Sequence, residues 1–155
     1  MARDTASDTA RDIADETPTT TLPTKPPRTN LDSEPFWAAT GEGRLTLQRC
    51  SACDTVIWWP RSLCPNCSSF DIEWFDATGQ GSVYSYTVVY QSPGRRWGEA
   101  TPYVLAYVEL DEGPRLMTNI VGCDPETVTI DQRVRVVFDD TGEGNALPRF
   151  TPLDT

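Results

Sequence analysis

Four of the five cysteines in this 155-residue chain fall into two short pairs. Cys50 and Cys53 form one C-x-x-C pair, and after ten residues Cys64 and Cys67 form another. Two tight turns at this separation can present four thiolates to one tetrahedral ion, as in a four-cysteine zinc ribbon. The spacing therefore predicts one structural zinc ion bound by Cys50, Cys53, Cys64 and Cys67.

Other uses of these cysteines are less consistent with the sequence. A four-thiolate site also accepts iron, which remains the main competing metal. Two disulfides are disfavoured, because no apolar signal-peptide core precedes the cysteines and facing C-x-x-C pairs in a reducing cytosol mostly bind metal. A redox C-x-x-C motif occurs singly, at a strand-to-helix turn. Four thiolates leave no open coordination position, so we expect the metal to hold structure and to catalyse nothing.

The residue after each cysteine pair departs from the usual pattern. This position commonly requires a positive φ and is commonly glycine, but here it is Asp54 in the first turn and Ser68 in the second. Asp tolerates the left-handed region better than Ser does.

Composition excludes several classes of function. The 23 acidic residues outnumber the 13 basic ones, so the chain repels phosphate backbones, and non-specific nucleic-acid binding is disfavoured. Histidine is absent, which removes the commonest general base and every Ser-His or Cys-His arrangement.

The remaining cysteine, Cys123, is expected to be a turn thiol. No apolar run approaches the ~20 residues that span a bilayer. We expect a cytoplasmic, non-catalytic protein.

The chain divides into three parts. Residues 1–30 are rich in Thr, Ala, Asp and Pro and are expected to form a disordered tail or a linker, extended over its proline-rich end. Residues 31–78 are expected to hold a short helix and the zinc ribbon, and residues 79–155 a barrel. Gly79 and Gly81 mark the second boundary.

The helix and ribbon are unusually aromatic. Asp32 or Ser33 can cap a helix that ends near Ala39 and carries Phe36 and Trp37. Alternation predicts ribbon strands at 44–49, 55–60 and 70–75. A small ribbon has almost no core of its own. We therefore expect an apolar seam with the next module, formed by Trp58, Trp59, Trp74 and Phe75.

The rest of the chain alternates as short strands without a helical period. The expected strands are 83–90, 102–110, 114–121 and 133–138, with a weaker one at 147–150. Five such strands in this length favour a small closed barrel, and an OB-fold is the natural candidate.

A longer loop, 92–101, separates the first two of these strands. It carries the adjacent basic pair Arg95 and Arg96 beside Trp97. Arginine offers a planar fork that matches phosphate, and tryptophan offers a stacking face, so these three residues are candidates for ligand binding. A solvated hairpin tip is the alternative.

Several segments in order resemble one known family. They are Pro35-Phe-Trp37, the stretch from Leu47 through the four cysteines, Gly81 to Thr87, Tyr103 to Leu110, Asn119 to Gly122 and Pro148-Arg-Phe150. Together they are similar to the acyl-CoA-associated zinc-ribbon plus OB-fold family, long a domain of unknown function. The resemblance implies a short N-terminal helix, a rubredoxin-like ribbon and a C-terminal OB barrel.

The resemblance also implies a function. Members act as non-catalytic subunits that bind or channel acyl-CoA beside thiolase-like proteins, and some are fused to a MaoC-like hydratase domain. In that setting the module resembles the partner of a lipid-transfer-protein aldolase that cleaves a steroid side-chain CoA thioester by a retro-aldol reaction. We expect Arg95, Arg96 and Trp97 to meet CoA, and the partner to contact Phe36, Trp37, Trp58 and Trp59. The alternative from another class is a single-stranded nucleic-acid binder built on the OB barrel.

Overall fold

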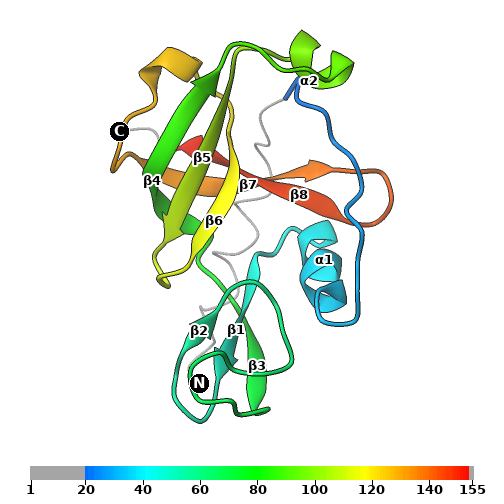
Figure 1. The fold of residues 1–155 in the computed structure, drawn as a ribbon, viewed down its shortest axis with the longest axis vertical. Coiled ribbons are helices and arrows are strands. Elements are labelled where there is room, and N and C mark those ends of the chain that lie inside the picture. The colour runs from blue at the N-terminus through cyan, green and yellow to red at the C-terminus, as the bar shows by residue number, and fades with distance from the viewer. Residues whose placement is uncertain (1–19, 154–155) are drawn as a thin grey trace, which may run out of the picture.

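The computed structural model describes residues 20–153, in which a small sheet and a closed barrel lie end to end (Figure 1). Helix α1 spans Glu34–Gly41. The small sheet has the order β2-β1-β3, and its strands are β1 (Thr46–Cys50), β2 (Val56–Ile57) and β3 (Ile72–Asp76). The barrel has the order β4-β5-β6-β8-β7, and its strands are β4 (Gln80–Val89), β5 (Tyr103–Leu110), β6 (Arg115–Ile120), β7 (Arg133–Asp140) and β8 (Ala146–Pro152). A 3-10 turn, Pro125–Thr127, lies between β6 and β7.

The barrel confirms the predicted five-stranded architecture. Most neighbours are antiparallel, whereas β6 and β8 pair in parallel at Ile120 and Phe150, and β4 closes the circle on β7. Strand β4 begins at Gln80, before the expected start, because its first residues pair with β7. Strand β8 extends over Ala146–Pro152 because it pairs with β7 along its whole length.

One buried core joins the helix, the ribbon and the barrel. Phe36 of α1 and Leu47 of β1 belong to the same buried cluster as Val83 and Phe150 of the barrel. Trp58, Trp74 and Phe75 pack against this cluster, as predicted for the seam, whereas Trp59, the fourth residue of the predicted seam, is exposed. The ribbon has only a small cluster of its own, Cys50, Ile57 and Cys64. This small cluster by itself therefore gives the cysteine end of the ribbon little stability.

Helix α1 is fixed at its carboxyl end by the β7–β8 hairpin. The Ala146 amide donates to the Thr40 hydroxyl across 3.2 Å, and a Cβ at Gly41 would collide with the Gly144 carbonyl. At the other end the expected side-chain cap is wrong. Ser33 makes no capping bond, and its Oγ instead accepts from the Asn30 amide at 3.1 Å. The contact with the hairpin thus determines where the helix sits.

The proline-rich segment 20–30 has no helix or strand, as expected of a linker, but it contacts the barrel. The carbonyl of Pro23 accepts from Arg149, and the Thr24 hydroxyl donates to Asp139 at 2.5 Å. In Figure 1 this blue segment passes from α2 to α1 and crosses β8 on the way. The remainder of the predicted tail, residues 1–19, lies outside the described residues.

The loop between β4 and β5 contains a helix that the sequence did not predict. Helix α2 (Arg95–Glu99) is one short turn, with an Arg95–Glu99 ion pair of 3.3 Å and a Thr101 hydroxyl that donates to the Gly98 carbonyl at 2.8 Å. Because the helix is so short and is flanked by glycine and proline, its sequence shows no helical pattern of apolar residues. No helix between residues 20 and 153 has the length and apolarity that a membrane crossing requires.

Candidate metal centre and aromatic groove

The two cysteine pairs form matching turns. The Asp54 amide donates to the Cys50 carbonyl at 2.9 Å, and the Ser68 amide donates to the Cys64 carbonyl at 3.0 Å. Asp54 has φ 58° and Ser68 has φ 61°, so both occupy the left-handed region that the sequence indicated. The first turn lies between β1 and β2 and the second between β2 and β3, and the four sulfurs converge on one place.

The four sulfurs have the geometry of one tetrahedral site. Cys50 Sγ lies 3.6 Å from Cys67 Sγ, Cys53 Sγ lies 3.7 Å from Cys64 Sγ, and all four lie within 4.8 Å of one another. Zn–S bonds of about 2.3 Å would place tetrahedral sulfurs about 3.8 Å apart. The four cysteines are therefore positioned to bind a metal ion, with every ligand position filled.

The electrostatics of the cluster favour a cation. Hydrogen bonds with the Thr55 hydroxyl and the Asn66 amide lower the pKa of Cys53 to about 6. A backbone hydrogen bond from Ser69 lowers the pKa of Cys67, but neighbouring thiols, led by Cys53, and burial raise it to about 12. Four adjacent thiols cannot all ionise at neutral pH by themselves. A divalent cation removes that conflict, because it stabilises every thiolate at once.

The predicted aromatic residues gather around Phe36. Phe36 is fully buried, and its ring centroid lies 4.9 Å from Trp37, 5.1 Å from Trp58 and 5.6 Å from Trp59, mostly in edge-to-face contact. We call Phe36, Trp37, Trp58 and Trp59 the aromatic cluster. Phe36 was expected among the partner contacts, but its burial within this chain leaves the three tryptophans as the cluster's surface, with Trp59 38% exposed.

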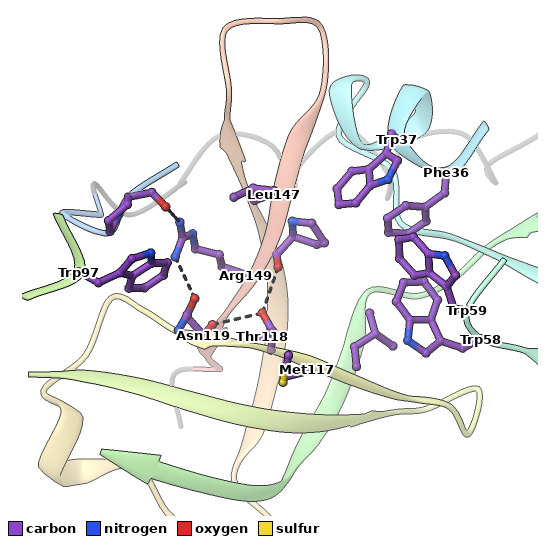
Figure 2. A pocket seen from close by; sticks show the side chains of 13 residues that line it. Phe36, Trp37, Trp58, Trp59, Trp97, Met117, Thr118, Asn119, Leu147 and Arg149 are labelled. Atoms are coloured by element: carbon purple, nitrogen blue, oxygen red, sulfur yellow. Dashed lines mark hydrogen bonds between the residues drawn. The ribbon is translucent and has the colours of Figure 1, made fainter. Parts of the chain in front are cut away.

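A groove runs between the aromatic cluster and Trp97. Figure 2 shows the cluster on one side, Trp97 on the other, and Thr118, Asn119 and Arg149 between them. The cavity holds about 230 Å³. Leu147 and Met117 line it from two further directions. The groove thus has apolar walls and a polar floor.

Arg149 organises the polar floor. Its side chain is 3% exposed, and burial lowers its pKa although Asp139 opposes that shift. Nε lies 2.9 Å from Asp139 Oδ2, Nη1 donates to Asn119 Oδ1 at 3.0 Å, and Nη2 donates to the Pro23 carbonyl at 3.0 Å. The guanidinium therefore ties three segments together, and its charge is compensated.

The structure separates the three residues of the β4–β5 loop that were candidates for CoA. Arg95 and Arg96 are exposed on α2, and Arg95 pairs with Glu99. Trp97 is half-buried and faces the groove, and its ring is tilted by 53° to that of Tyr103 with the centroids 4.9 Å apart. Of the three residues, only Trp97 lines the groove that the aromatic cluster also lines.

Sequence reasoning missed Arg149, Asn119 and the docked segment around Pro23. An arginine directly before Phe150 in the predicted strand 147–150 was the available signal, because a charge in a strand that packs on the core requires partners. Its partners come from segments far apart in the chain, and no local pattern identifies them.

Both modules match known protein families. Residues 37–73 match the family model described as the ChsH2 rubredoxin-like zinc ribbon domain, and residues 74–139 match that of the ChsH2 C-terminal OB-fold domain. The chain belongs to the ChsH2 (DUF35) family. A chain in the solved structure of the Ltp2-ChsH2(DUF35) aldolase has 39% identity and a TM-score of 0.74, over 82% of this chain and 98% of that one.

Curated relatives of this ChsH2-family chain carry different names. A "Probable enoyl-CoA hydratase alpha subunit" of Thermomonospora curvata is 40% identical over 81% of this chain. A DUF35 domain-containing scaffold protein of Methanocaldococcus jannaschii is 41% identical over 58%. A 3-oxo-4,17-pregnadiene-20-carboxyl-CoA hydratase alpha subunit of Mycobacterium tuberculosis is 29% identical over 74%. The chain spans 39%, 64% and 36% of these relatives, respectively.

Proposed function

We propose that this chain is a non-catalytic subunit that binds and stabilises a thiolase-like enzyme acting on acyl-CoA, with the chemistry on the partner. The observation that carries the proposal is the likeness to the Ltp2-ChsH2(DUF35) aldolase, at 39% identity over nearly the whole of the matched chain. The scaffold name of the M. jannaschii relative supports the same role.

The residues of the chain support a role without catalysis. The sequence contains no histidine, and four of its five cysteines converge on the metal centre. The fifth, Cys123, is half-buried, and burial raises the pKa of its thiol. A thiol held in its protonated form is a poor nucleophile, so this chain lacks the activated cysteine that thiolase-type chemistry requires.

We assign the partner contact to the surface of the aromatic cluster. Trp59 is 38% exposed, and Trp37 and Trp58 are half-buried beside it. Exposed tryptophans packed on a rigid base are typical anchors of protein interfaces. Phe36 supports them from beneath, because its ring contacts all three.

The metal is assigned as zinc with a structural role. Four sulfur ligands at tetrahedral spacing fit zinc and leave no site for substrate. The bound ion would fix the two turns and hence the base on which Trp58 and Trp59 sit. Its contribution here is to folding.

The finer assignment is a retro-aldolase complex of steroid side-chain degradation, with CoA near Arg95, Arg96 and Trp97. The steroid-derived CoA ester named for the M. tuberculosis relative supports the substrate class. Exposed arginines suit CoA phosphates, and Trp97 offers a stacking face. The hydratase names carried by longer relatives support association with a MaoC-like hydratase domain.

Complex formation with an Ltp2-type aldolase tests this proposal. Size-exclusion chromatography of the mixed proteins should give a joint peak, and Trp59→Ala should weaken binding by at least tenfold. The matched control is Phe70→Ala, which removes a ring that is exposed but lies outside the aromatic cluster. Equal binding by both variants would refute the assigned surface, and no joint peak with the unmodified chain would refute the subunit role.

A further inference from the structure

The groove beside the aromatic cluster already holds part of its own chain. Pro23 lines the groove together with Trp97, and its backbone carbonyl accepts from Arg149 Nη2. The next residue, Thr24, donates its hydroxyl to Asp139. Residues 22–27 contain three prolines and adopt no helix or strand. A proline-containing segment is thus held at the groove by a side-chain donor to its carbonyl and by a hydroxyl bond to Asp139.

Two buried donors that line the groove, Trp37 Nε1 and Arg149 Nε, make no hydrogen bond within residues 20–153, but Arg149 Nε lies 2.9 Å from its counter-charge on Asp139. Indole is a donor only, and a buried donor without a partner is destabilising. Trp37 lines the same groove as Pro23, so an occupant with a carbonyl oxygen would satisfy it.

The charge on the polar floor is already compensated. Arg149 is neutralised by Asp139 and bonded to Asn119, and the Thr118 hydroxyl donates to the Pro148 carbonyl at 3.0 Å. A phosphate or carboxylate would therefore meet no uncompensated charge here. The complement of this groove is an uncharged group that presents apolar rings to tryptophan and a carbonyl oxygen to an N–H.

An extended proline-containing peptide has this chemistry. Its rings pack on aromatic walls, its carbonyls are free of internal hydrogen bonds, and its stiffness lowers the entropy lost on binding. The contacts of Pro23 and Thr24 show that the floor accepts such a backbone. A cavity of about 230 Å³ remains beside them.

We propose that this groove is a docking site for an extended proline-containing segment of a partner protein, which residues 22–27 occupy in part from within the chain. The proposal rests on the proposed function for the identity of the partner but not for the chemistry of the groove. Trp37 Nε1 donates to a carbonyl of the entering segment. The residues around Pro23 compete with that segment for the part of the groove floor formed by Arg149.

Binding of a fluorescein-labelled decaproline peptide to the full chain, measured by fluorescence polarisation, tests the proposal. We expect Thr24→Ala to tighten binding about fivefold, because it removes one hydrogen bond of the competing segment. In the Thr24→Ala background, Trp37→Phe should weaken binding about fivefold, because it deletes the indole N–H and keeps a ring. A Gly-Ser decamer of equal length is the matched control peptide.

A second measurement does not depend on these variants. In the unmodified ¹⁵N-labelled chain, the indole N–H resonance of Trp37 should move on titration with decaproline as it gains an acceptor. Decaproline binding no better than the Gly-Ser peptide, or a stationary Trp37 resonance at saturation, would overturn the proposal. No aldolase is present in either measurement, so this failure is distinct from failure of the subunit role.

Discussion

Arg149 of β8 and Asp139 of β7 form a buried ion pair in which Nε lies 2.9 Å from Oδ2, with the two side chains 3% and 18% exposed. The pair lies beneath the groove and also holds Thr24 of the N-terminal segment. Since a desolvated charge is costly without its counter-charge, the two residues depend on each other.

Replacing Asp139 should therefore be strongly destabilising. Asp139→Asn leaves the Arg149 charge buried without a counter-charge, and we expect a loss of about 3–5 kcal/mol in the free energy of unfolding, measured by urea denaturation. The control is Asp76→Asn, which breaks an exposed ion pair with Arg44 of 2.7 Å and should cost less than about 1 kcal/mol. Equal losses would contradict the account of the buried pair.

Metal removal should unfold the ribbon, because its own apolar cluster is small. Cys64→Ser, or a strong chelator, should abolish stoichiometric zinc and lower stability by several kcal/mol. Cys123→Ser is the matched control, since that cysteine lies outside the four-sulfur cluster, and it should retain one zinc per chain. Elemental analysis and thermal melts measure both effects. Iron in place of zinc, or a ribbon stable without metal, would count against the assignment.

Ser68→Gly should stabilise the metal-loaded protein. Ser68 holds φ at 61°, and the left-handed region costs a residue with a Cβ roughly 1–2 kcal/mol, part of which glycine recovers. A gain of about 1 kcal/mol should raise the melting temperature by a few degrees. Ser62→Gly, at an exposed position outside the positive-φ set of the described residues, should instead be neutral or destabilising. A lower melting temperature for Ser68→Gly would show that the turn is not strained.

Asp111 should contribute a pH-dependent increment to stability. Both guanidinium nitrogens of Arg133 donate to its carboxylate, at 2.7 and 2.8 Å, and these bonds lower the pKa of Asp111 in the folded state. Because the folded pKa is depressed, the contribution is present above the unfolded pKa of about 3.9 and is lost as pH falls through the folded value.

The comparison of Asp111→Asn with the unmodified chain isolates this effect. The pair is partly exposed, so we expect a difference of only about 0.5 kcal/mol at pH 7 in urea denaturation, and none at a pH below the folded pKa. A difference that grows on acidification would reverse the sign and contradict the argument.

The cysteine spacing and the strand alternation were sufficient to predict the four sulfur ligands and the five-stranded barrel. Both are local signals, since ligand spacing and period-two patterning lie within short windows. Helix α2 was missed because one turn between Gly94 and Ala100 has no measurable period. Ser33 is the N-cap residue as predicted, but its side chain makes no capping bond because its hydroxyl bonds to the backbone of Asn30.

The groove could not be predicted, because its parts are brought together only by the fold. Pro23, Trp37, Trp97 and Arg149 lie in four separate segments. The sequence predicted that Phe36 and the three tryptophans contact a partner protein. Phe36, however, is fully buried within this chain. Distinguishing the supporting ring from the exposed ones required the contacts of α1 with the ribbon and barrel.

The central claim is that this chain supports catalysis by a partner. The most direct measurement is retro-aldol cleavage of a steroid side-chain CoA thioester by an Ltp2-type aldolase, assayed alone and with equimolar chain. We predict activity only for the mixture, and none for the chain by itself. Full activity of the aldolase alone, unchanged on addition of the chain, would contradict the account, and oligonucleotide binding would then be the next property to test.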